Sequence, residues 1–281
     1  MYGHRYRLGA AAAALALVTL VAAGCGDDDD DDATADETAE TPESDSGGGG
    51  ADLAAYCEAE LGLETAPEPE VDWETASPEE IATAVKGYAA DTMRPLATQL
   101  IDAAPDELGA DIAVLDQALT DLEESGDFAV FETPDALAAQ EALHVFDLDN
   151  CGWATVDVTL GDYSFDGIPA EVDAGVVSFE LANEGTELHE LLLLRKNDGV
   201  TQPVEELLAL PEEEAMSLVT PVGAPATPAP GTDGYSVAEL EPGDYIAVCF
   251  IPMGTTSFDT PPAADAPPHF TQGMVTEFSV A

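Results

Sequence analysis

The sequence predicts a multidomain protein of the α plus all-β class, in which a small helical bundle precedes a β-sandwich. A chain of 281 residues is long enough for two domains of ordinary size. Apolar residues in residues 51–153 recur three or four positions apart, as they do on one face of a helix. From residue 154 they alternate with polar residues, and short turn-forming sequences separate the alternating runs, as in a sandwich over residues 154–281.

The charge of the chain limits its partners. Asp and Glu number 58 and Lys and Arg only 6, which gives a formal net charge of −52. Such a chain is repelled by phosphate backbones, so nucleic acid is excluded as a partner. An anionic membrane surface repels it as well, so any membrane attachment must be covalent or hydrophobic.

The N-terminus predicts export. Residues 1–24 have the organisation of a secretory signal peptide, with basic residues, an apolar run too short to span a membrane, and then small residues. The sequence from Leu20 to Cys25 resembles the lipobox of bacterial lipoproteins, which implies a lipid on Cys25 and attachment to the outer face of the cell membrane. An ordinary signal-peptidase site and an uncleaved anchor are the alternatives. Residues 25–50, acidic and then glycine-rich, predict a disordered tether.

About four helices are expected in residues 51–153. Ser77-Pro78-Glu79-Glu80 is a strong helix start, because it combines a capping serine, a proline in the first turn and a glutamate three residues after the cap. Further helix starts are predicted at Pro105 and Thr133. His144 stands alone on the last of these helices and is expected to be a surface histidine or a hydrogen-bonded core histidine.

The four cysteines suggest one disulfide. Outside the cytoplasm, Cys57 and Cys151 bracket the helical unit and form the natural pair, and closing that loop stabilises the fold by about 4–5 kcal/mol. This pairing leaves Cys249 without a partner. A single thiol in an oxidising compartment is expected to be buried or to bind a metal. A bridge between Cys249 and either Cys57 or Cys151 is the alternative.

The pattern of residues 154–281 predicts short strands, and two segments that are not strands interrupt them. Residues 203–210 look helical, and residues 221–230, rich in Pro and Ala, predict a surface loop that need not be ordered. The predicted strands are 154–160, 162–165, 175–182, 187–195, 235–240, 244–251 and 273–280.

Four side chains in this half could form a metal site. In chain order they are His189, Cys249, His269 and Met274. An Asn183-Glu184-Gly185 turn precedes the first histidine, and Pro242-Gly243-Asp244-Tyr245 leads into the strand of the cysteine. This order of turns and ligands resembles the cupredoxins over residues 155–281. The resemblance implies a cupredoxin-like sandwich in which these four side chains bind copper, and an electron-transfer function with a redox partner protein.

The residue types suit copper, because thiolate and imidazole bind it in both oxidation states and a thioether tunes the potential. The chain departs from the family in one respect. Nineteen residues separate Cys249 from His269, where cupredoxins have only a few, so we expect the compact loop that holds the ligands to be lost. Met253 and Glu190 are competing ligands. The alternative is a metal-free envelope module for binding or interaction that keeps the sandwich, and no catalytic signature indicates an enzyme.

Overall fold

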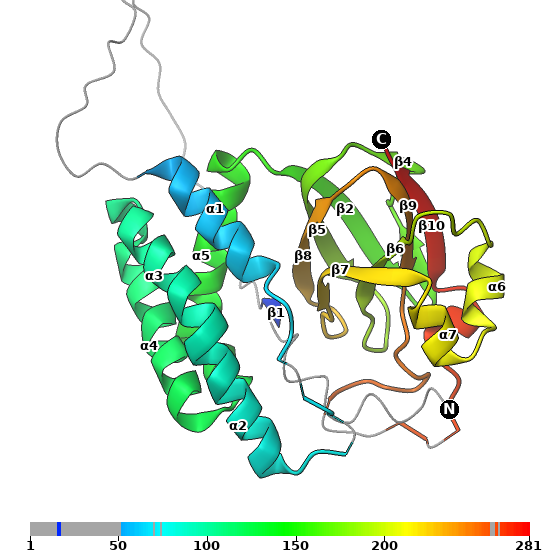
Figure 1. The fold of residues 1–281 in the computed structure, drawn as a ribbon, viewed down its shortest axis with the longest axis horizontal. Helices are drawn as coiled ribbons and strands as arrows, with labels where there is room; N and C mark the ends of the chain where they lie inside the picture. The colour runs from blue at the N-terminus through cyan, green and yellow to red at the C-terminus, as the bar shows by residue number, and fades with distance from the viewer. Residues whose placement is uncertain (1–15, 18–51, 70, 74, 259–261, 264) are drawn as a thin grey trace, which may run out of the picture.

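The protein is described by a computed structural model over residues 16–17, 52–69, 71–73, 75–258, 262–263 and 265–281 (Figure 1). Apart from Ala16–Leu17, the predicted signal peptide, Cys25 and the tether lie outside these residues. Among the described helices, none has both the length and the apolar character needed to cross a membrane.

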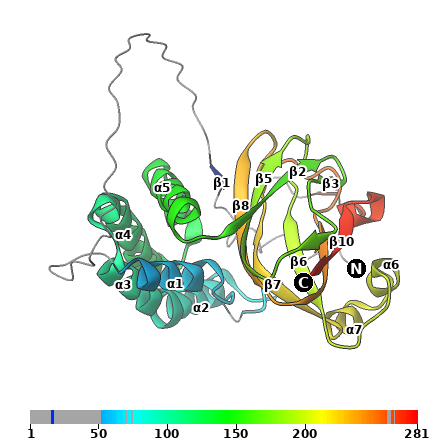
Figure 2. The same ribbon diagram turned by 90° about the horizontal axis from the view of Figure 1, so that it is seen from above.

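Helices account for most of the described residues between Leu53 and Asn150. They lie beside one another and to one side of the strands (Figures 1 and 2). α2 and α3 form one continuous rod, because the π-helical turn η3 (Ala89–Met93) joins them. The α-helices of this unit are α1 (Leu53–Glu64), α2 (Pro78–Tyr88), α3 (Arg94–Ala103), α4 (Gly109–Ser125) and α5 (Pro134–Asn150), with short 3-10 turns η4 (Asp106–Leu108) and η5 (Phe128–Glu132) on either side of α4.

The helix boundaries follow from local hydrogen bonds. The Ser77 hydroxyl accepts a bond from the backbone N–H of Glu80 at 3.3 Å, and the Glu80 carboxylate accepts one from the N–H of Ser77 at 2.8 Å. This reciprocal pair is the predicted cap of α2. The Thr133 hydroxyl caps α5 in the same way, through the N–H of Ala136. α4 ends at Gly126, whose φ of 70° favours glycine.

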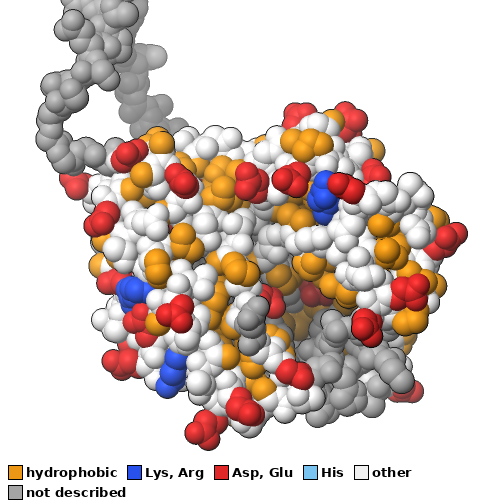
Figure 3. Space-filling model, in the orientation of Figure 1, with side chains coloured by type: hydrophobic (Ala, Val, Ile, Leu, Met, Phe, Trp, Pro, Cys, Tyr) orange, Lys and Arg blue, Asp and Glu red, His pale blue; other side chains and the backbone are white. Residues whose placement is uncertain are grey.

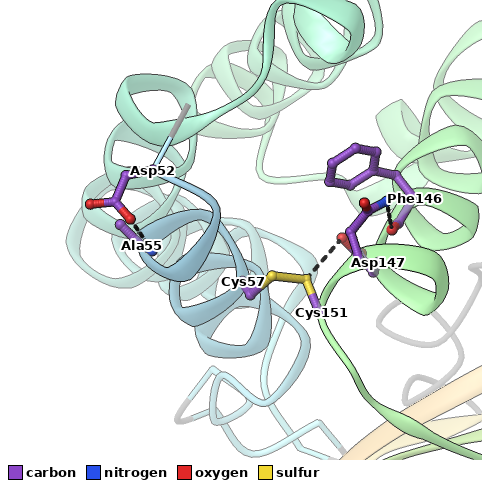
Figure 4. The surroundings of a disulfide bond; sticks show 7 residues. Asp52, Ala55, Cys57, Phe146, Asp147 and Cys151 are labelled. Carbon is purple, nitrogen blue, oxygen red and sulfur yellow. Dashed lines mark hydrogen bonds between the residues drawn. A yellow bond between two sulfur atoms is a disulfide. The ribbon is translucent and has the colours of Figure 1, made fainter. Parts of the chain in front are cut away.

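The predicted disulfide is present. Cys57 of α1 is bonded to Cys151, the residue that follows α5 (Figure 4). Cys249 remains a free, buried thiol, so the alternative pairings are wrong. The bridge ties the first helix of the unit to the last, and Tyr56 and Phe146 pack edge to face beside it with ring centroids 5.3 Å apart.

Two sheets form the second half of the chain. Their orders are β1-β8-β5-β2-β3 and β4-β10-β9-β6-β7, and both contain parallel and antiparallel pairs. The main hydrophobic core lies between them and includes Phe179 and Leu181 from one sheet and Leu193 and Tyr245 from the other. The strands are β1 (Ala16–Leu17), β2 (Ala154–Gly161), β3 (Ser164–Asp166), β4 (Glu171–Val172), β5 (Gly175–Asn183), β6 (Leu191–Lys196), β7 (Val219–Ala226), β8 (Asp233–Leu240), β9 (Gly243–Val248) and β10 (Val275–Val280).

One region of the sandwich was predicted wrongly. Where a Pro/Ala-rich loop was expected, β7 runs along the edge of its sheet, paired only with β6. An edge strand tolerates Pro221 and Pro225, because one row of its backbone groups needs no ladder partner. The predicted helix at 203–210 is present as α6 (Val204–Leu208), and α7 (Glu212–Met216), which was not predicted, follows it.

Two strands are shorter than predicted at the same end of the sandwich. β6 begins at Leu191 rather than at residue 187, and β9 ends at Val248 rather than at residue 251. The residues released from the ladders make other contacts: the N–H of Leu188 donates to the carbonyl of Thr255 at 2.8 Å, and the N–H of His269 donates to the carbonyl of Ile251 at 2.9 Å. These departures from strand geometry build the site described below.

The helical unit contacts the sandwich through His144 of α5. Its ring stacks on Tyr235 of β8 with centroids 3.5 Å apart, and its Nε2 lies 3.1 Å from the carboxylate of Glu180 on β5. His144 is buried, so it is the hydrogen-bonded core histidine that was one of the two expectations.

Candidate metal centre

Two imidazoles and one thiol lie together at the end of the sandwich where β6 begins and β9 ends. One ligand atom from each of His189, Cys249 and His269 lies within 4.8 Å of the other two. The two Nδ1 atoms are 3.1 Å apart, and Cys249 Sγ is 3.3 Å from Nδ1 of His269. All three side chains are 0% exposed. Residues that are 60 and 20 positions apart in the chain are therefore brought together in a site closed to water.

The turn after β5 places His189. The N–H of Gly185 donates to the Asn183 side-chain carbonyl at 2.9 Å, and the amide of Asn183 donates to the carbonyls of Glu187 and Pro228. Asn183 is thus the brace that folds the chain back towards the sandwich. A Cβ atom on residue 185 would lie 2.4 Å from Nε2 of His189, so a glycine is required there.

The long segment between Cys249 and His269 is closed at its base. The N–H of Phe270 donates to the carbonyl of Cys249 at 3.0 Å, so the two ligands are neighbours in spite of the 19 residues between them. Beyond that pair, Pro252 and Pro268 form a β-bridge, and the N–H of Met253 donates to the carbonyl of Pro267 at 3.0 Å. The expectation that the long insertion removes the compact packing of the ligands is therefore wrong, because the residues next to the two ligands form a paired stem.

Met274 lies against the other predicted ligands through its backbone. Its carbonyl accepts the N–H of Cys249 at 3.2 Å, and its N–H donates to the carbonyl of His269 at 3.3 Å. Its side chain is 0% exposed and belongs to the main core, whereas Met253 is partly exposed. The structure thus brings the backbone of all four predicted residues into one neighbourhood, and ligation by the Met274 thioether stays a prediction.

Sequence reasoning missed two carboxylates that hold the outer nitrogens of the imidazoles. His189 Nε2 lies 3.3 Å from Asp162 Oδ1, and His269 Nε2 lies 3.0 Å from Glu187 Oε2. Glu187 also accepts hydrogen bonds from the Tyr163 hydroxyl at 3.1 Å and from the N–H of Gly254 at 2.5 Å. Carboxylates in this position fix the orientation of a ligating histidine and increase its basicity.

Comparison with protein-family models and with curated proteins finds no match to this chain. Similar solved structures include dithionite-reduced auracyanin from Roseiflexus castenholzii, at 18% identity over 46% of this chain and 97% of that chain, with a TM-score of 0.30. Auracyanin A from Chloroflexus aurantiacus, described as a "blue" copper protein, is similar at 17% identity over 46% of this chain and all of that chain, with a TM-score of 0.28. The copper-containing nitrite reductase of Thermus scotoductus is similar at 12% identity over 46% of this chain and 31% of that chain, with a TM-score of 0.24.

The chemistry of the centre therefore depends on the residues that form it.

The electrostatics of this centre favour a bound cation. Burial lowers the pKa of both His189 and His269, which keeps the imidazoles neutral and their lone pairs available. Burial, followed by the charge of Glu190, raises the pKa of Cys249. A thiolate is therefore costly at this position unless a positive charge lies beside it.

Two of the three separations fit one ion. Two bonds of roughly 2.0–2.3 Å from a single metal span at most about 4.0–4.6 Å, and the separations of 3.1 Å between the two Nδ1 atoms and 3.3 Å between Cys249 Sγ and His269 Nδ1 lie within that limit. Glu190, a competing ligand by sequence, instead accepts a hydrogen bond from the N–H of Phe250 at 2.6 Å. One sulfur and two nitrogen donors remain, which suits copper.

Proposed function

We propose that this protein is an exported, lipid-anchored copper protein that transfers single electrons at the outer face of the cell membrane. The observation that carries the proposal is the meeting of one thiol and two imidazoles within 4.8 Å in a buried site. The signal sequence and the lipobox ending at Cys25 support export and lipidation.

His189, Cys249 and His269 would hold the copper, with the thioether of Met274 as a weak fourth ligand. Copper supplies a one-electron couple in such a donor set. Asp162 and Glu187 hold the two imidazole rings in place through their outer nitrogens. Because the rings, the paired stem and the brace at Asn183 are all fixed by hydrogen bonds, the protein resists changes in ligand position, which favours rapid electron exchange.

A carrier of electrons fits this site better than an enzyme. The three ligand side chains are 0% exposed, so a substrate molecule has no direct access to them. Electrons can cross such a closed layer to a redox partner protein docked on the surface, whereas a substrate must reach an open coordination position.

The second candidate is a metal-free envelope module that keeps the cupredoxin-like sandwich. One observation favours it: the polar atoms of the centre already contact one another, with His189 Nδ1 and His269 Nδ1 3.1 Å apart and Cys249 Sγ accepting the N–H of Glu190 at 3.5 Å.

Titration of the purified metal-free protein with Cu(II) separates the two candidates. We expect a thiolate-to-copper charge-transfer band that saturates at one copper per chain, and a higher melting temperature, because a ligand at 100 times its Kd stabilises a fold by about 2.7 kcal/mol. The Cys249→Ser variant should lose the band and keep the unfolding transition of the metal-free protein. If the protein shows no band, or if Cys249→Ser keeps it, the metal-free module is the better description.

A further inference from the structure

A second site lies in the helical unit, on residues that the copper centre does not use. A pocket of about 210 Å³ opens between the helices, and Tyr235 of β8 closes one side of it. Its walls are mostly apolar, with contributions from all the helices of the unit. They include Leu63, Leu100, Ile112, Leu115, Leu119 and Phe128. About seven water molecules occupy this volume in liquid water, so the pocket has enough room for a short hydrocarbon body.

The apolar wall contains a polar group without a hydrogen-bond donor, the carboxylate of Glu60. Its side chain lines the pocket from α1 and is 6% exposed, and its Oε2 has no hydrogen-bond partner among the described residues. A buried carboxylate oxygen without a donor lowers the stability of the fold. A ligand that enters the pocket and brings a donor would remove that cost.

The surroundings of Glu60 specify the charge of the donor. Burial raises the pKa of Glu60, and the nearby carboxylates of Asp147 and Glu64 raise it further, so a positive charge brought to this end of the pocket would stabilise the ionised form of Glu60. Among the described residues that line the pocket, none is Lys or Arg. The face drawn in Figure 3 carries many acidic and few basic side chains, and it therefore attracts cations and repels anions.

A metal ion fits the Glu60 end of the pocket less well than an organic cation does. Within the described part of the chain, His189, Cys249 and His269 form the group of three metal-binding side chains, and Glu60 and its neighbours are not gathered in that way. An ammonium group needs only one close carboxylate, and its hydrocarbon body would cover the apolar walls.

We propose that the helical pocket binds an apolar organic cation, whose hydrocarbon body fills the space between the helices and whose protonated amine donates a hydrogen bond to the Glu60 carboxylate. The site is separate from the copper centre, and either one can be present without the other.

The proposal is tested with three probes of equal length, hexylamine, hexanol and hexanoate, titrated calorimetrically into the full-length, copper-free protein. We expect hexylamine to bind at least tenfold more tightly than hexanol, and hexanoate not to bind. Equal affinity for hexylamine and hexanol, or no binding of hexylamine, overturns the proposal.

Three variants locate the binding. Glu60→Gln removes the charge and should weaken hexylamine at least tenfold while hexanol is little changed. Glu58→Gln is the matched control, because it makes the same change at an exposed position of α1 and should leave both affinities unchanged. Ala97→Phe fills the pocket and should abolish the binding of both probes. If Ala97→Phe or Glu60→Gln binds hexylamine as tightly as the unaltered chain does, the amine is held by the acidic surface and the proposal is wrong.

Discussion

The paired stem at the copper centre predicts that most of the long insertion can be removed without loss of metal binding. In the sequence, residues 258–265 stand between Met253 and Pro267, which belong to the two sides of the stem that joins Cys249 to His269. Replacing them with two glycines keeps Gly254 and Thr255, whose backbone groups contact Glu187 and Leu188. Phe258 is 46% exposed, so little buried apolar area is lost with it.

The expected energies follow from loop length. The segment between the ligands falls from 19 residues to 13, and the entropy of closing a flexible loop then improves by about 0.3 kcal/mol, since it scales as 1.5RT ln n. The hydrogen bonds from Phe270 to Cys249 and from His269 to Ile251 are retained. We therefore expect the free energy of unfolding to rise by about 0.3 kcal/mol and the Cu(II) affinity to stay within about twofold.

Two measurements check this prediction: competition for Cu(II) with a chelator of known affinity, and urea denaturation of the metal-free protein. A matched deletion of Pro252 and Met253 removes fewer residues, but it breaks the bridge to Pro268 and should lower the affinity far more. If the shortened loop loses copper while the stem deletion keeps it, the stem does not position the ligands and the reasoning is refuted.

Two further predictions concern carboxylates. Glu187→Gln keeps an acceptor for His269 Nε2 but removes the negative charge, so the affinity for copper should fall on the order of 10–100-fold in the same competition assay, and an unchanged affinity would show that the charge plays no part. Burial raises the pKa of Asp147 to about 7, so between its unfolded pKa of about 3.9 and this value the folded state binds more protons than the unfolded state does. Stability should therefore decrease as the pH rises from about 4 to 7, by at most about 4 kcal/mol, and urea denaturation across that range should show a flatter profile for Asp147→Asn than for the exposed control Asp149→Asn. Equal slopes for the two variants would contradict this assignment.

The strands were predictable where their signal is local. Alternation along 154–160 and 175–182 reflects a core on one face, and β2 and β5 form there. β7 was missed because its prolines suggest a loop, and only the sheet order shows that it is an edge strand. The start of β6 and the end of β9 were missed for a related reason: residues 187–190 and 249–251 lie outside the ladders and contact a segment distant in the sequence.

The clustering of His189, Cys249 and His269 was predictable because their order along the chain is distinctive, but the carboxylates behind them were not. Asp162 lies in the turn after β2, and its partner Thr186 lies in the turn after β5. The two turns are adjacent because β2 and β5 pair in parallel, with Leu160 opposite Asn183. In a chain with 58 acidic residues, spacing alone does not single out one carboxylate, so only this register identifies it.

The helical unit and the sandwich keep their cysteines unreactive in different ways. Cys57 and Cys151 are oxidised to the disulfide of the helical unit, which leaves no reactive thiol at either position. Cys249 has no such partner, and the protein protects it by complete burial, which raises its pKa and keeps the thiol protonated and unreactive. Burial of that kind is sufficient for a structural cysteine, but it does not explain two neutral imidazoles held by carboxylates beside the sulfur. A cation that converts the thiol to a thiolate accounts for all three groups together, and this is why the centre is better explained as a metal site than as a packed core.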